Sequence, residues 1–240
     1  MEITFVKTSL LFALVSSCAI ILSPATPARA DGIRINSSSL VLAPGHMSGM
    51  IRVENDRAIP DVVQVSVFSF AGGMPSQNLS PTDDVLGVPA IFTIPPHGAQ
   101  VVRIAMRGPN GSQDERAYRV RVEEIQSKYA ATSGLSTLLQ LNFPVYVEPI
   151  DTPEQTASWS MQRSSDSIKL TLSNRGNVHI RVRGWKLSDS SQDVVAQSKD
   201  DITVMPGQSN TWTVKEARSF SGPLNLHADG DVGPLTAVLQ

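Results

Sequence analysis

Apolar residues occupy every second position over residues 135–149, and this alternation is the feature that most limits how the chain can fold. The odd-numbered positions from Leu135 to Val147 are apolar apart from Thr137, and most even-numbered ones are polar. A period of two over this span predicts a β-strand with one apolar face. Pro144 has no N–H for a ladder, which favours an edge or bulged strand. Because an exposed apolar edge promotes aggregation, pairing with another chain is a natural explanation for its presence.

The first thirty residues have the pattern of a secretory signal peptide. A short apolar core over residues 9–22 is followed by two prolines and an Ala-Arg-Ala cleavage pattern. The apolar run is short for a membrane anchor, so we expect residues 1–30 to be removed on export and the mature chain to lack a membrane span. Since the only cysteine, Cys18, lies in this segment, the mature chain is expected to contain no disulfide.

The remainder of the chain predicts an all-β protein. Runs rich in Val, Ile and Thr recur between clusters of Gly, Pro, Asn and Asp, and little helical periodicity is present. Prolines near residue 150 divide these runs into two halves of about seven strands each. We therefore expect two tandem immunoglobulin-like β-sandwich domains, at residues 31–149 and 150–240. The expected strands cover residues 33–42, 47–54, 62–70, 89–94, 100–106, 117–125, 135–149, 158–161, 168–173, 180–188, 191–196, 202–205, 210–214 and 224–228.

Two further signals concern the second half of the chain. Gly176 and Gly207 lie in turn-like segments, where we expect them to supply positive φ angles. Three tryptophans are expected to anchor the core of the second sandwich, namely Trp159, Trp185 and Trp212.

The sequence offers little material for catalysis. One cysteine and four histidines are scattered, without the spacing of a metal-binding or nucleophile motif. The acidic pairs Asp83-Asp84 and Glu123-Glu124 are interpreted as solvated surface charge, because adjacent residues of a strand point to opposite faces. With 20 Lys and Arg against 22 Asp and Glu, the charge does not favour nucleic acid or an anionic membrane as a partner. We expect a binding protein that is not an enzyme and holds no metal or cofactor.

Several segments, in order, resemble the periplasmic chaperones of the chaperone–usher pathway, which assemble pili and fimbriae. The resemblance covers essentially the whole mature chain. It is strongest at residues 89–106 (PAIFTIPPHGAQVVRIAM), 117–125 (AYRVRVEEI), 142–149 (NFPVYVEP), 170–182 (LTLSNRGNVHIRV) and 204–212 (VMPGQSNTW). The Gly-Asn-x-His and Pro-Gly-Gln pieces are most similar to the archaic branch of the pathway.

The resemblance implies a periplasmic protein of two immunoglobulin-like sandwiches in a boomerang arrangement. Such a chaperone lends an edge strand to an incomplete pilus or fimbrial subunit, which is later transferred at an outer-membrane usher. The family's donor strand corresponds to the alternating strand at residues 135–149, and Phe143 onward would belong to the chaperone's own core. Self-capping of the free chaperone as an oligomer would hide the same edge. The residues expected to enter the subunit groove are Leu135, Thr137, Leu139 and Leu141.

This chain departs from the family at the anchor for the subunit's terminal carboxylate. The best-known members use an arginine in the first strand and a lysine in the donor strand, but Ser39 and Pro144 stand in these places here. A buried carboxylate still needs a cationic or N–H partner. Arg103, in the family-like Gln-x-x-Arg strand, is the first candidate. Weaker candidates are Arg34, Arg52 and Arg119.

Two other classes of protein stay open on the residues alone. A secreted tandem immunoglobulin-like module with a structural or adhesive role would keep the apolar face of residues 135–141 inside. An exported hydrolase on a β-sandwich would need a cleft in which His97 or His179 meets a carboxylate.

Overall fold

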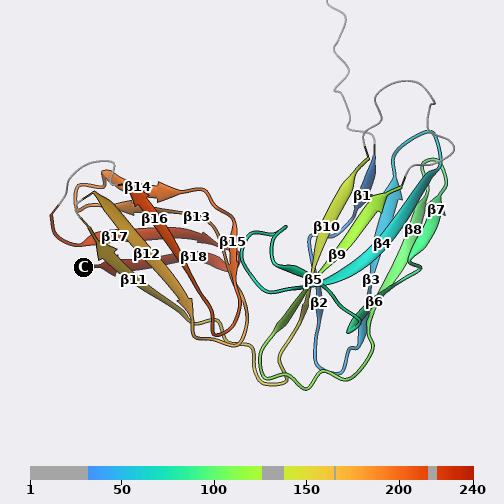
Figure 1. Ribbon diagram of the computed structural model, residues 1–240, viewed down its shortest axis with the longest axis horizontal. Helices are drawn as coiled ribbons and strands as arrows, with labels where there is room; N and C mark the ends of the chain where they lie inside the picture. The colour runs from blue at the N-terminus through green and yellow to red at the C-terminus, as the bar shows by residue number, and fades with distance from the viewer. Residues whose placement is uncertain (1–31, 126–137, 165, 216–220) are drawn as a thin grey trace, which may run out of the picture. The chain divides into compact units, whose positions relative to one another are not determined.

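The computed structural model describes residues 32–125, 138–164, 166–215 and 221–240. Every regular element in these ranges is a β-strand, so the expectation of an all-β protein is confirmed (Figure 1). The strands form four sheets, which pair into two immunoglobulin-like sandwiches. Within the described part of the chain, no helix is long and apolar enough to cross a membrane.

The N-terminal sandwich is built from β1 to β10. Its smaller sheet has the order β1–β3–β8–β6, with bounds Ile33–Ile35, Ser48–Asn55, Ala99–Met106 and Val85–Val88. Its larger sheet has the order β2–β10–β9–β4–β5, with bounds Leu40–Leu42, Gln140–Val147, Arg116–Glu124, Asp61–Phe70 and Leu79–Pro81. In addition, β7 (Ile91–Ile94) pairs with β4.

The C-terminal sandwich is built from β11 to β18. Its three-stranded sheet has the order β11–β12–β16, with bounds Ala157–Arg163, Ser167–Asn174 and Ser209–Lys215. Its five-stranded sheet has the order β14–β13–β17–β18, with bounds Val194–Ser198, Ile180–Ser188, Leu224–Gly230 and Gly233–Leu239. In that sheet β15 (Ile202–Val204) also pairs with β13.

Each sandwich has its own apolar core, formed by residues that alternate along the strands. In the first, Tyr118, Val120 and Val122 of β9 face inward together with Phe143 and Val145 of β10. In the second, Trp185 and Trp212 are buried with their ring centroids 6.0 Å apart, and Trp159 packs against them, as expected. Burial of one face per strand is the physical consequence of the two-residue period.

The structure corrects the strand expected over residues 33–42. It is two strands in different sheets, because β1 pairs with β3 whereas β2 pairs in parallel with β10. A run of serines lies between them, and Ser37 bonds the carbonyl of Ser39 there in place of a ladder. Three short or Gly- and Pro-containing strands were also missed, namely β5, β6 and β18.

Two glycines expected to have positive φ behave differently. Gly207 has φ of +71°, as its turn requires. For Gly176 the expectation is wrong, because it is not among the residues of positive φ. A Cβ there would lie 2.1 Å from the carbonyl oxygen of Glu154 and 2.7 Å from the amide nitrogen of Thr156. Glycine is needed at 176 because two backbone segments approach closely.

The expected signal peptide, residues 1–30, lies outside the described residues. The domain boundary at 149/150 falls in the segment between β10 and β11 and stays a prediction.

Candidate functional site

One stretch of β10 has an open edge in the described part of the chain. β10 pairs with β9 over its whole length, but on its other side β2 pairs only with Val145–Val147. Because the carbonyl of Leu139 accepts the N–H of Glu124, odd-numbered backbone groups of β10 face β9 and even-numbered ones face the open side. The N–H that Pro144 lacks would point to the open side, where no described strand pairs with it. This confirms the expected edge character of the strand.

The described donor candidates partly cover the protein's own core. Leu139 and Leu141 are half-buried against the core of the N-terminal sandwich, whereas Leu138, on the opposite face, is 52% exposed. Leu135 and Thr137 lie outside the described residues. Phe143 and the odd positions after it are fully internal. The apolar face thus passes from half-buried to buried along the strand, and its donation to a subunit stays a prediction.

A hollow of about 340 Å³ lies beside this edge, between β1 and β10. Arg34, Ser37 and Ser38 line one side of it, and Asn142 lines the other. The Oδ1 atom of Asn142 is buried and has no hydrogen-bond partner among the described residues. Because buried polar atoms are normally bonded, this side chain is suited to meet a polar group supplied by another molecule.

Arg103, the first candidate for the carboxylate anchor, lies on the outer face of β8. Its recorded partner in the described part of the chain is the hydroxyl of Ser48, at 2.7 Å, and not a carboxylate. Its cross-strand neighbours Met50 and Val88 are 70% and 57% exposed. Strand β3 separates β8 from β1, so Arg103 belongs to a face of the sheet and not to the open edge of β10. Its role as anchor stays a prediction.

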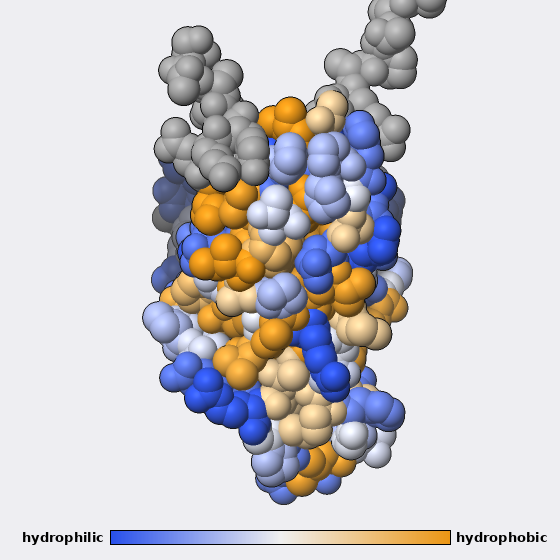
Figure 2. Space-filling view, turned by 90° about the vertical axis from the view of Figure 1, so that its right-hand side faces the viewer, coloured by the Kyte–Doolittle hydropathy of each residue, from blue (hydrophilic) through white to orange (hydrophobic). Residues whose placement is uncertain are grey.

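The outer face around Arg103 carries several exposed apolar side chains. Figure 2 shows the side of the molecule where β7 and β8 lie in Figure 1, and apolar areas are interspersed there with charged ones. We define the outer-face patch as Arg103 together with four exposed apolar residues on this face of the β1–β3–β8–β6 sheet, namely Met50, Leu86, Val88 and Val101.

The three weaker anchor candidates are already engaged. Arg34 forms ion pairs with Glu54 and Asp56, and Arg52 pairs with Glu54 at 2.8 Å. Arg119 is only 3% exposed and lies 3.8 Å from the ring centroid of Phe70, its Nη1 donating to the carbonyl of Tyr118. Burial lowers the pKa of Arg119. This arginine therefore belongs to the fold rather than to an exposed strand face.

The interpretation of Glu123-Glu124 as solvated charge is wrong for Glu124. This residue is 5% exposed, since it shares the inward face of β9 with Val120 and Val122. Its carboxylate pairs with Arg57 at 2.9 Å and accepts the N–H of Leu139 at 3.0 Å. Sequence reasoning missed this ion pair because Arg57 is distant along the chain. The usable signal was that Glu124 falls on the same alternating face as the inward-facing valines of β9.

His179 lies between two carboxylates. Its Nδ1 is 2.6 Å from Glu115 and its Nε2 is 3.2 Å from Asp231, while its ring stacks on Tyr146 with centroids 3.9 Å apart. Burial alone would lower the pKa of His179, but hydrogen bonds and charge from Asp231 and Glu115 outweigh it and raise that pKa to about 9.

This arrangement does not provide a catalytic base. Both ring nitrogens of His179 are engaged by carboxylates, so neither is free to accept a proton from a substrate. No group of His, Cys, Asp and Glu among the described residues has the arrangement of a metal site. The contact is instead an ion-pair network that joins segments far apart in the sequence.

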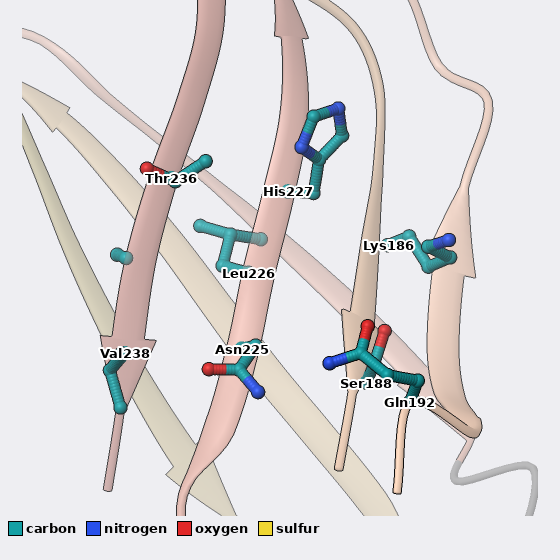
Figure 3. Close-up of a pocket in the computed structure, with 9 residues that line it drawn as sticks. Lys186, Ser188, Gln192, Asn225, Leu226, His227, Thr236 and Val238 are labelled. Atoms are coloured by element: carbon teal, nitrogen blue, oxygen red, sulfur yellow. The ribbon is translucent and has the colours of Figure 1, made fainter. Parts of the chain in front are cut away.

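A second hollow, of about 630 Å³, lies on the five-stranded sheet of the C-terminal sandwich (Figure 3). Lys186, Asn225 and His227 project into it from β13 and β17, and Thr236 and Val238 come from β18. No carboxylate lines it, so an acid–base pair is missing from this surface.

These features describe an all-β protein with an open, half-apolar strand edge and no assembled catalytic site in its described residues. A family model for pili and flagellar-assembly chaperones, the PapD N-terminal domain, matches residues 32–153, about half of the chain. The chain belongs to this chaperone family, whose role is not enzymatic. A search of curated proteins gives no match.

Solved structures of pilus chaperones share the fold. One is the CsuC–CsuE chaperone–tip adhesion subunit pre-assembly complex from archaic chaperone–usher Csu pili of Acinetobacter baumannii, with 14% identity, a TM-score of 0.63, and 86% of this chain and 97% of that chain covered. Another is the Salmonella enterica SafA pilin in complex with the SafB chaperone, with 16% identity, a TM-score of 0.62, and coverage of 88% and 98%. The E. coli chaperone DraB has 17% identity, a TM-score of 0.62, and coverage of 88% and 97%.

Proposed function

We propose that this chain is a periplasmic chaperone that folds and caps pilus or fimbrial subunits and delivers them to an outer-membrane usher. Capping would proceed by donor-strand complementation, in which the open edge of β10 completes the subunit's fold. The similarity of two sequence segments to the archaic branch, and of the fold to the Csu chaperone complex, supports assignment to that branch.

The observation that carries this proposal is the unpartnered edge of β10 at Gln140–Pro144. Backbone groups of the even-numbered residues are available there for a ladder, and the half-buried Leu139 and Leu141 provide an apolar face beside them. Pairing with a subunit would cover this edge, which would otherwise be a site for aggregation.

Capture of a subunit tests the proposed function directly. We expect the exported chain to co-purify in equal amounts with a pilus subunit encoded beside its own gene, and to protect that subunit from periplasmic proteolysis. A subunit that is degraded equally with and without this chain would contradict the proposal.

The anchor for the subunit's terminal carboxylate is a separate part of the proposal. Arg103 has a charge that no described carboxylate neutralises, whereas Arg34 lines the hollow beside β10 but already pairs with Glu54 and Asp56. We retain Arg103 as the first candidate for the anchor. The outer-face patch around it is also our candidate surface for the usher, because β3 separates it from the β1–β10 hollow.

The variant Arg103→Ala separates these two roles. If Arg103 holds the carboxylate, subunit affinity is expected to fall about tenfold or more, since a charge-assisted hydrogen bond contributes roughly 1.5–3 kcal/mol. Titration of the subunit by calorimetry measures this. The matched control is Arg52→Ala, on the same face but paired with Glu54. Unchanged subunit affinity with weaker binding to the usher would instead assign Arg103 to usher docking.

A further inference from the structure

The start of β10 is held by one buried side chain. The carboxylate Oε2 of Glu124 accepts the N–H of Leu139 at 3.0 Å, and the backbone N–H of Glu124 donates to the carbonyl of Leu139 at 2.9 Å. In a regular antiparallel pair, the backbone carbonyl of Glu124 would accept that N–H. The carboxylate takes its place, and the regular β9–β10 pairing accordingly begins one residue later, at Gln140 opposite Glu123.

Arg57 holds this carboxylate in place and is itself paired with Asp61. Nη1 of Arg57 lies 2.9 Å from Oε1 of Glu124 and 2.9 Å from Oδ1 of Asp61, while its Nη2 donates to Oε2 of Glu124 at 3.2 Å. The backbone of Arg57 is itself fixed, because its N–H donates to Oδ1 of the buried Asn55 at 2.9 Å. A continuous series of hydrogen bonds therefore runs from the end of β3 to the first residue of the β10 segment that packs on the core.

Leu139 is also covered by the chain ahead of β1. A Cβ at Gly32 would lie 3.4 Å from Cδ2 of Leu139 and 3.7 Å from Nη2 of Arg57, so the chain ahead of β1 packs over this contact. Leu138, one residue earlier, is largely exposed. Leu138 and Leu139 point to opposite faces of the strand, so only the odd-numbered face is covered here.

We propose that Glu124, held by Arg57, is a positioning residue for the donated strand. It determines the residue at which the strand leaves the chaperone's own sheet, and thereby the register in which the lent residues meet a subunit. A shift of one residue would turn the other face of the strand toward the subunit groove, so a fixed starting point matters for capture. This inference rests on the proposed donor-strand function.

Spin labelling tests the positioning without a subunit. The only cysteine of the chain, Cys18, lies in the expected signal peptide. A nitroxide is therefore attached to the exported protein at Leu138→Cys, and at Val238→Cys as a distant exposed control. Glu124→Ala is expected to increase label mobility at 138 and leave that at 238 unchanged. Glu124→Gln keeps an acceptor oxygen and is expected to restore most of the ordering. Should Glu124→Ala not fold, Arg57→Gln is expected to mobilise the label at 138 in the same direction.

Subunit capture supplies the second measurement. Glu124→Ala is expected to weaken capture of the pilus subunit about tenfold, the effect of losing one charge-assisted hydrogen bond, with partial rescue by Glu124→Gln. Asp201→Asn, which breaks the Arg181 ion pair of the other sandwich, is the matched control and should leave capture unchanged. A lower melting temperature with unchanged label mobility at 138 and unchanged capture would overturn the proposal, because Glu124 would then be a structural residue only. If the wild-type chain captures no subunit, the proposed donor function is wrong. The mobility of the label at 138 then still shows whether Glu124 positions the strand.

Discussion

Leu139→Arg is expected to weaken subunit capture by at least about a hundredfold. Burying a leucine contributes roughly 1.5–3 kcal/mol, and the variant would also place a charge in the apolar groove of the subunit. A hundredfold loss corresponds to about 2.7 kcal/mol. Because Leu139 is half-buried against the core of the N-terminal sandwich, we also expect a lower melting temperature of the free protein. Calorimetric titration and circular dichroism measure the two effects separately.

Leu138→Arg is the matched control, since Leu138 is adjacent, exposed and on the opposite face of the strand. It is expected to change capture by less than about threefold, because an exposed position loses little on substitution. If Leu138→Arg abolishes capture and Leu139→Arg does not, the donated face is the even-numbered one. Full capture by both variants would remove this part of β10 from the binding site.

Raising the pH from about 6.5 to 9 is expected to reduce the free energy of unfolding by about 3 kcal/mol through His179 alone. The pKa of His179 is raised to about 9 in the folded protein, against an ordinary value of 6.5. A raised histidine pKa means that the folded state binds the proton more tightly, so the stabilisation is fully present below pH 6.5 and is lost as the pH rises through 9. Urea unfolding at a series of pH values measures this slope.

His179→Gln should abolish most of this pH dependence and destabilise the protein at pH 6, because Glu115 and Asp231 would lose their cationic partner. The control is His227→Gln, whose ring is largely exposed and lies 3.6 Å from Asp229. Its pH profile is expected to follow that of the wild type. Equal slopes for wild type and His179→Gln over this range would show that His179 is not the titrating group.

Local patterns predicted much of the fold. The two-residue period identified most strands of both sandwiches, because a strand with one buried face has apolar residues at alternate positions. The same reasoning failed at residues 33–42, where four polar residues (36–39) interrupt the apolar pattern and the chain passes from one sheet to the other. The serine run was a usable signal for a break, but the local pattern does not show which neighbour each short strand pairs with.

Charged residues were the least predictable part of the site. Glu124 was interpreted as solvated charge and Arg119 as a candidate anchor, yet both are buried, Glu124 against Arg57 and Arg119 against Phe70. The environment of such a residue depends on which distant side chain reaches it. Their burial is favourable only because that partner is present.

By itself, the sequence determined that this chain is an all-β protein of two sandwich domains with an apolar strand before residue 150. These properties follow from alternation and turn residues, which act over a few neighbours in the chain. Only the tertiary structure decided that β2 leaves one edge of Gln140–Pro144 open in the described part of the chain, that Glu124 binds Leu139, and that His179 joins Glu115 to Asp231. Each of these depends on contacts between residues distant in sequence, whose energies exist only once the strands have been brought together.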